Sequence, residues 1–91
     1  MSGELHCVLV TPDGSRYAGT VWQVTVPGTA GRFSMRKDHA PVVAALVAGN
    51  VEIAVTEQER RQFGVSGGVL RCRENRCTIL CPEVTAPSGG V

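Results

Sequence analysis

The sequence has few aromatic side chains, no long apolar run and no excess of charge of one sign. Its 91 residues include only one tryptophan, one tyrosine and two phenylalanines. The core is therefore expected to consist mainly of Val, Leu, Ile and Ala, and branched aliphatic residues favour short strands. The length fits one domain, near the lower limit at which a chain forms a sufficient core of its own.

These absences exclude several classes of partner. A formal net charge of +1 produces no field strong enough to attract nucleic acid or an acidic membrane surface. The longest apolar run, residues 40–49, is about half of the roughly 18 residues that a membrane-spanning helix needs. Residues 1–4 show no secretory signal pattern. We expect a soluble cytoplasmic protein that binds no nucleic acid and does not insert into a membrane, although it can dock on a membrane complex.

No pattern of catalytic or cofactor-binding residues stands out. A nucleophile needs a base within reach, and neither Ser34 nor Ser66 has a histidine near it in the sequence. No spaced pair of carboxylates suggests acid and base catalysis. Gly67 and Gly68 are not followed by a helix signal or a Lys-Ser/Thr pair, which argues against a phosphate-binding loop. We therefore predict no catalytic, cofactor-binding or metal site.

Four cysteines in so short a chain need an explanation. The spacing Cys-x4-Cys-x3-Cys lacks the close pairs of structural zinc sites, and neither histidine shows metal-ligand periodicity with it. Strand alternation places Cys77, Ile79 and Cys81 on one face. Cysteine often behaves as a small buried hydrophobe. The pattern favours buried core cysteines, with a metal or disulfide role as the alternative, for Cys7, Cys72, Cys77 and Cys81.

Apolar alternation and turn residues divide the first part of the chain into strands. The first strand is predicted at 4–10 and ends at the turn 11–14, and the next is predicted at 16–26. Gly19 is expected to mark a bulge or a bend between two sheets. Trp22 is expected to anchor the core, since a buried tryptophan contributes about 150 to 250 Å² of contact area.

The second half continues the same pattern, with no convincing helix. We predict an all-β fold, a flattened antiparallel β-sandwich or barrel, in a domain covering 1–83. The Pro, Ser and Gly tail at 84–91 is predicted to be disordered. The remaining strands are predicted at 42–47 and 51–56, joined as a hairpin; at 61–66, after a charged tip at 57–61; and at 69–73 and 77–81, which pair across 74–76, with Pro82 ending the sheet.

The stretch 26–41, VPGTAGRFSMRKDHAP, interrupts this strand pattern. Pro27, Gly28 and Gly31 break regular pairing, and four charged or titratable residues follow at 36–39. We expect a polar loop at the end of a sheet, where binding surfaces are usually displayed. The alternative is a solvated connection that has no partner.

An ordered set of motifs resembles a known family. The motifs are Leu5, Cys7, Leu9, Val10 and Pro12; Tyr17-Ala18-Gly19; VPGTAGRFSM; His39-Ala40-Pro41; and Val65-Ser66-Gly67-Gly68. With these motifs in this order, the chain resembles, over residues 4 to 83, the N-terminal domain of the epsilon subunit of F-type ATP synthases. The resemblance implies a β-sandwich of two five-stranded sheets and a non-catalytic rotor subunit of the central stalk.

The same resemblance implies partners and their contact residues. The domain would bind the gamma subunit and rest on the loops of the c-ring, which couples ring rotation to ATP synthesis with ion transport. It would be a peripheral subunit at the cytoplasmic face of the inner (plasma) membrane, soluble when isolated. The implied c-ring contacts are Thr29, Ala30, Gly31, Arg32, Lys37, Asp38 and His39, and the implied gamma contacts are Thr11, Pro41, Val42, Val43, Leu80, Cys81, Pro82 and Glu83.

This sequence also departs from the family's pattern. Family members often have an acidic residue where Arg32 stands, so we expect an acidic or neutral residue on the matching ring loop. Residues 35–38 replace an aliphatic, a proline and a glycine, which leaves the contacts of this loop open. The family's C-terminal helical hairpin is expected to be absent here. The other functional classes are a β-sandwich binding module of another complex, or a cysteine-based metal or redox protein.

Overall fold

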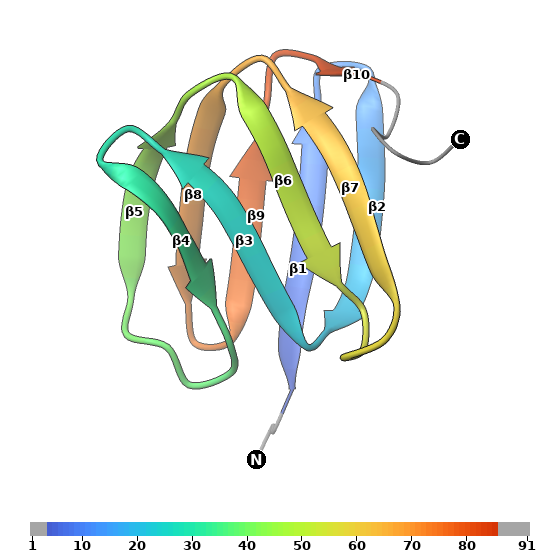
Figure 1. Cartoon of the computed structure of the whole chain (residues 1–91), viewed down its shortest axis with the longest axis vertical. Coiled ribbons are helices and arrows are strands. Elements are labelled where there is room, and N and C mark those ends of the chain that lie inside the picture. Colours follow the sequence, from blue (N-terminus) through green and yellow to red (C-terminus); the bar gives the residue numbers. More distant parts are fainter. Residues whose placement is uncertain (1–3, 86–91) are drawn as a thin grey trace.

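The computed structural model describes residues 4–85, and these form strands without any helix (Figure 1). No helix in this part is long and apolar enough to span a membrane. The strands are β1 (Leu5–Thr11), β2 (Gly14–Val21), β3 (Gln23–Gly28), β4 (Gly31–Met35), β5 (Val42–Leu46), β6 (Gly49–Ala54), β7 (Arg60–Val65), β8 (Gly68–Arg73), β9 (Arg76–Leu80) and β10 (Val84–Thr85).

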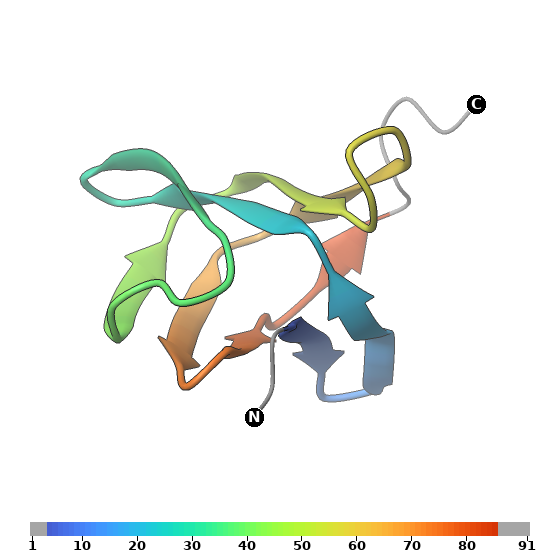
Figure 2. The same ribbon diagram turned by 90° about the horizontal axis from the view of Figure 1, so that it is seen from below.

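The strands form two layers that curve around a common interior (Figures 1 and 2). One layer contains β10, β7, β6 and β3 in that order, with β4 also paired to β3, and the other contains β5, β8, β9, β1 and β2. A single register pair, Gly28 with Leu46, joins them into one continuous path. All pairs are antiparallel except β1 with β9, which is parallel. The predicted all-β sandwich or barrel is confirmed.

The core follows from side-chain alternation along the strands. In β1 the buried residues are Leu5, Cys7, Leu9 and Thr11, and the residues between them face outward. The interior is mainly aliphatic, as expected, and Phe63 is the one aromatic side chain of the described residues that is buried. All four cysteines are buried, which confirms their predicted place in the core.

Trp22 and Gly19 do not have the predicted roles. The chain leaves the first strand pair at Trp22, between β2 and β3, whereas Gly19 lies within β2. The irregular register occurs instead between Leu9 and Val10 of β1. Trp22 is only half-buried, with the Arg36 guanidinium carbon 4.1 Å from its ring centroid. A cation above the ring gives an aromatic side chain a stable place at the surface.

Most of the stretch 26–41 is a hairpin rather than a loop. β3 runs through Pro27 to Gly28, and β4 returns from Gly31 after a tip at Thr29 and Ala30. Pro27 lacks an amide hydrogen, but its carbonyl accepts a hydrogen bond from the Val47 amide (2.9 Å), so it still contributes to the sheet. Only residues 36–41 remain as a loop, and we call this segment the 36–41 loop.

The structure corrects the pairing predicted for 42–47 and 51–56. β5 and β6 are neighbours in sequence but do not pair, because β5 pairs with β8 and β6 pairs with β3 and β7. The predicted charged tip before β7 is confirmed. β8 and β9 pair as predicted, but across a turn of two residues, Glu74 and Asn75, both with positive φ.

The C-terminal part of the described chain also differs from the prediction. The sheet does not end at Pro82, because Val84 and Thr85 form β10 beside β7. These two residues belong to the tail that the sequence predicts to be disordered. The rest of that predicted tail, 86–91, lies outside the described residues.

Candidate docking surface

The outer side of the second layer exposes apolar side chains in adjacent strands. Val43 is 72% exposed, Leu80 54% and Val69 44%, which is unusual for large aliphatic residues. Residues on one side of a sheet alternate along each strand, so these three face outward together. We call this surface the outer face; its residues are Val43, Ala45, Val69, Arg71, Arg73, Arg76, Thr78 and Leu80.

Strand register arranges this outer face in rows. Ala45, Val69 and Leu80 form an apolar row across β5, β8 and β9. The next row contains Val43, Arg71 and Thr78, and the last contains Arg73 and Arg76. A shallow hollow of about 440 Å³ follows these side chains. The face therefore combines an apolar end with a basic end, and Glu74 in the adjoining turn is the one acidic residue that lines the hollow.

The residues predicted to contact a gamma subunit lie only partly on this face. Val43 and Leu80 are on it, whereas Val42 is half-buried and Cys81 is 3% exposed. Thr11 is also buried, where its hydroxyl donates to the Gly14 carbonyl (3.2 Å) and closes the turn before β2. The others are exposed near the ends of β5 and β9: Pro41, Pro82 and Glu83.

Sequence reasoning missed the central part of the surface. Val69, Arg71 and Arg73 alternate along β8 with the buried Leu70 and Cys72. That alternation was available in the sequence, and it indicates which side chains of this strand face outward. It does not identify the neighbouring strands, which depend on the pairing of β8 with β5.

The predicted c-ring residues do not form one surface. Thr29 and Ala30 form the tip between β3 and β4, with Gly31 and Arg32 at the start of β4, whereas 37–39 follow the other end of β4 (Figure 1). The five residues of β4 separate the two groups by roughly 15 Å. At the tip, Arg32 Nη1 donates to the Asn50 carbonyl (2.7 Å). Lys37, Asp38 and His39 are exposed and lead directly into β5.

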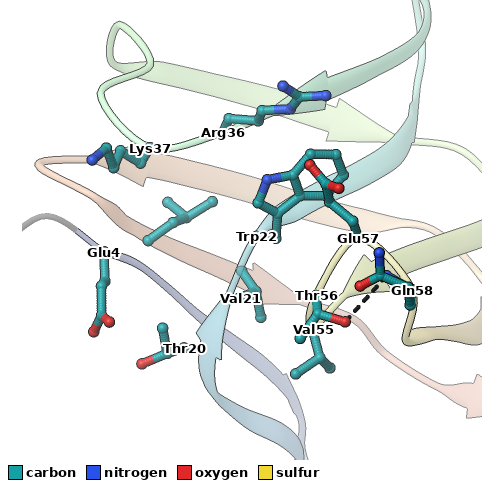
Figure 3. Close-up of a pocket in the computed structure, with 11 residues that line it drawn as sticks. Glu4, Thr20, Val21, Trp22, Arg36, Lys37, Val55, Thr56, Glu57 and Gln58 are labelled. Atoms are coloured by element: carbon teal, nitrogen blue, oxygen red, sulfur yellow. Dashed lines mark hydrogen bonds between the residues drawn. The ribbon is translucent and has the colours of Figure 1, made fainter.

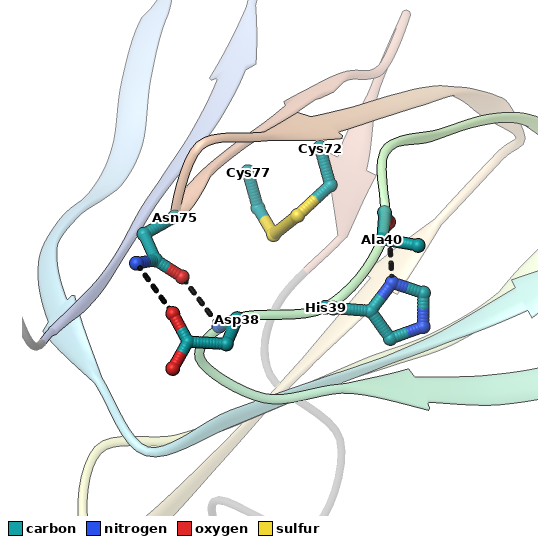
Figure 4. The surroundings of a disulfide bond; sticks show 6 residues. All are labelled: Asp38, His39, Ala40, Cys72, Asn75 and Cys77. Atoms are coloured by element: carbon teal, nitrogen blue, oxygen red, sulfur yellow. Dashed lines mark hydrogen bonds between the residues drawn. A yellow bond between two sulfur atoms is a disulfide. The ribbon is translucent and has the colours of Figure 1, made fainter.

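The 36–41 loop is attached to the turn between β8 and β9 (Figure 4). The Asp38 amide donates to Asn75 Oδ1 (2.6 Å), and Asn75 Nδ2 donates to Asp38 Oδ1 (3.3 Å). The Asn75 carbonyl also accepts from the His6 amide of β1 (2.9 Å). Within the loop the His39 amide donates to the Arg36 carbonyl (3.2 Å). One turn residue therefore links the loop, the hairpin and the first strand.

A disulfide lies directly behind this turn. Cys72 and Cys77 are opposite each other in β8 and β9 and are bonded, while Cys7 and Cys81 are free. The disulfide was the alternative interpretation of the cysteine pattern. Burial raises the pKa of the Cys7 thiol to about 12 and also raises the pKa of Cys81. The described residues contain no group of three or more His, Cys, Asp or Glu side chains placed to hold a metal ion.

A second hollow, of about 680 Å³, lies beside Trp22 (Figure 3). Leu5 and Val21 are buried lining residues, and charged residues of both signs also line the hollow. Trp22 is contacted by two cations, with the Arg60 guanidinium carbon 5.6 Å from the ring centroid in addition to Arg36. The hydroxyl groups in the lining are threonines, and the lining includes no histidine to act as their base.

Comparison with protein families identifies a match that spans all of the described residues. The model of the ATP synthase delta/epsilon chain, beta-sandwich domain, matches residues 4–87. The ATP synthase epsilon chain of Salinibacter ruber is 35% identical over 96 residues, which cover 97% of this chain and 64% of that relative. The epsilon chain of Chlorobium limicola is 32% identical over 77 residues, covering 85% of this chain and 88% of the relative.

Solved structures share the fold at lower sequence identity. A chain of the Euglena gracilis mitochondrial ATP synthase, in a structure of its OSCP, F1 and c-ring, matches with a TM-score of 0.89 at 18% identity. The match covers all of this chain and 57% of that one. A chain of the Tetrahymena thermophila mitochondrial ATP synthase central stalk and c-ring matches with a TM-score of 0.75 at 16% identity, covering 89% and 65% of the two chains.

Proposed function

Because the chain belongs to the family of ATP synthase delta/epsilon β-sandwich domains, we propose that it acts in the central stalk of a rotary ATP synthase as an epsilon subunit. Its role is to couple rotation of the c-ring to the gamma subunit during ATP synthesis with ion transport. The role is mechanical and non-catalytic. We further propose that the chain is a peripheral subunit at the cytoplasmic face of the inner (plasma) membrane and that it is soluble when isolated.

The outer face is the proposed contact with the gamma subunit, and its exposed apolar row is the observation that carries the proposal. Val69 and Leu80 face outward on a surface that no strand within 4–85 covers. Exposed apolar groups gain about 25 cal/mol for each Å² that a partner removes from water. Val43 and the exposed Pro41, Pro82 and Glu83 extend this contact. Thr11 and Cys81 are left out because their side chains are buried.

The proposed c-ring contact is the tip between β3 and β4. Thr29, Ala30, Gly31 and Arg32 are exposed there, and a short rigid hairpin can press against a polar loop without deforming. Lys37, Asp38 and His39 lie at the other end of β4, so we assign them to the stalk side, next to Pro41 and Val43. Arg32 implies an acidic or neutral residue on the ring loop, since charge complementarity at a rim mainly sets partner choice and association rate.

Calorimetric titration with the gamma subunit of the same organism tests the stalk contact. Leu80→Glu places a charge in the apolar row and is expected to weaken binding more than tenfold, which is roughly 1.4 kcal/mol. Ser34→Glu is the control, because Ser34 is an exposed residue of β4 in the other layer, away from the outer face. The control should bind as wild type does. Failure of the wild-type chain to bind at micromolar concentration, or equal binding by both variants, would refute the proposed contact.

A further inference from the structure

The cysteine pair behind the β8–β9 turn suggests chemistry that the stalk role does not use. We propose that the Cys72–Cys77 disulfide is a reversible thiol–disulfide site, covered by the 36–41 loop, and that its reduction by a dithiol releases this loop. The thiol chemistry does not depend on the proposed function. Only the expectation that the chain works in a reducing compartment rests on that function.

The first step of the argument is the position of the bond. Cys72 and Cys77 are the second register pair from the turn, so the disulfide fixes the two strands immediately behind Glu74 and Asn75. Asn75 holds the middle of the 36–41 loop through two hydrogen bonds to Asp38, while Arg36 at the start of the loop bonds Gln23 of β3. Any loosening of this hairpin therefore acts directly on the attachment of the loop.

The second step is access to the sulfur atoms. Cys72 is 2% exposed and Cys77 is 1% exposed. Val42, the first residue after the loop, is the register partner of Cys72, so the loop passes beside the disulfide. Figure 4 shows Asp38, His39 and Ala40 in its surroundings. On this side of the disulfide the loop has to lift before a reductant can reach the bond, and the Asp38 to Asn75 hydrogen bonds keep the loop in place.

The third step is the reaction itself. A thiolate of the dithiol attacks one sulfur of the Cys72–Cys77 bond, which breaks and leaves a mixed disulfide and one cysteine thiolate. The second thiol of the reductant, as its thiolate, then attacks the reductant's own sulfur in the mixed disulfide. This closes the reductant's cyclic disulfide, breaks its bond to the protein and releases the second cysteine as a thiolate, and both cysteine thiolates then take up a proton. Two electrons and two protons have passed from the reductant to Cys72 and Cys77. Disulfides of this kind in reducing compartments usually have a redox role.

An internal thiol does not replace the external reductant. Cys7 is the register partner of Cys77 in β1, so three cysteines lie in one row across β8, β9 and β1. The thiolate is the nucleophile in disulfide exchange. Burial raises the pKa of Cys7 to about 12, which keeps this thiol protonated and unreactive at neutral pH. The bond therefore stays between Cys72 and Cys77 until a dithiol reaches it.

The first experiment measures the rate at which dithiothreitol reduces the oxidised chain, followed by thiol titration. Asn75→Gly keeps the positive φ of the turn (62°) but removes both hydrogen bonds to the loop, and it should speed reduction about tenfold. Glu74→Gly is the matched control, since Glu74 has φ 51° in the same turn and its carboxylate pairs with Arg73 of β8 (3.6 Å). The control should react like wild type. Equal rates for wild type and Asn75→Gly, or four free thiols in the chain purified without reductant, overturn the proposal.

The second experiment compares amide hydrogen exchange in the oxidised and reduced chains. The Asp38 amide should exchange about tenfold faster after reduction, while the Ile53 amide in the core keeps its protection. Cys72→Val with Cys77→Val removes the bond while keeping apolar volume, and it should match the reduced chain. An unchanged Asp38 rate, or loss of protection at Ile53 through general unfolding, overturns the local release. Both experiments use the chain without a gamma subunit, so their failure is separate from failure of the proposed function.

Discussion

The outer sides of the two layers differ in how their polar groups are satisfied. On the β3 and β4 layer, Thr25 Oγ1 and Ser34 Oγ are 2.7 Å apart, and Arg36 Nε donates to Gln23 Oε1 (2.8 Å). On the β8 and β9 layer, Val69 and Leu80 are exposed instead. A sheet surface whose polar groups bond one another is suited to water, whereas an uncovered apolar row is suited to a partner. The comparison separates a solvent face from a docking face within one fold.

The largest expected effect is on gamma-subunit binding, and two variants that place a glutamate on either face measure it. Val69→Glu should weaken gamma-subunit binding by about 2 kcal/mol with little change in stability, because Val69 is exposed in the free chain. Ser34→Glu should leave binding unchanged but lower stability, since it removes the contact with Thr25. Calorimetry for binding and urea denaturation for stability measure the two effects. If Val69→Glu and Ser34→Glu weakened binding equally and lowered stability equally, the two faces would not differ in the way proposed.

An intermediate effect concerns the core between the two faces. Burial raises the pKa of Cys7 from 9.0 to about 12, so above pH 9 the unfolded chain loses this proton while the folded chain keeps it. The contribution of the protonated Cys7 thiol to the free energy of unfolding is fully present below pH 9 and is lost as the pH rises towards 12. Between pH 7 and pH 10 the loss is about 1.4 kcal/mol for this group. Cys7→Val should remove that part of the alkaline destabilisation in urea denaturation with excess dithiothreitol, and an equal pH dependence in both proteins would contradict the shift.

The smallest effect compares one arginine from each face. Arg36→Met removes the cation above Trp22 and should cost about 0.5–1 kcal/mol of stability, with a red shift of tryptophan emission as the ring meets water. Arg71→Met, on the docking face, should leave stability and emission unchanged but weaken gamma-subunit binding. Urea denaturation followed by fluorescence measures the first variant and its control together. An emission change in Arg71→Met would show that the two faces are not independent.

Local patterns predicted the strands but not their partners. Alternation in β1, β6 and β8 is visible in the sequence because each strand has one buried side. The prediction that β5 and β6 form a hairpin was wrong because each strand pairs with a strand that is not next to it in the sequence. β5 pairs with β8, and β6 pairs with β3. Trp22 was misplaced because its stacking on Arg36 is a tertiary contact.

A single geometric cause explains why the disulfide was only the alternative interpretation of the cysteine pattern. A turn of three residues at 74–76 places Arg73 opposite Cys77, whereas the observed turn of two residues places Cys72 there. Asn75 adopts positive φ readily, which favours the shorter turn. A change of one residue in turn length thus decides which side chains meet. It also decides which residue of the turn reaches the 36–41 loop.

The parallel pairing of β1 with β9 has a consequence for synthesis of the chain. The hairpin of β1 and β2 is made before the other strands of residues 4–85, yet β9, its further sheet neighbour among them, ends at Leu80. Contacts between residues so distant in sequence form slowly, because the intervening chain must first be brought together. The hairpin of residues 5–21 therefore keeps an open edge on β1 until residues 76–80 have been translated.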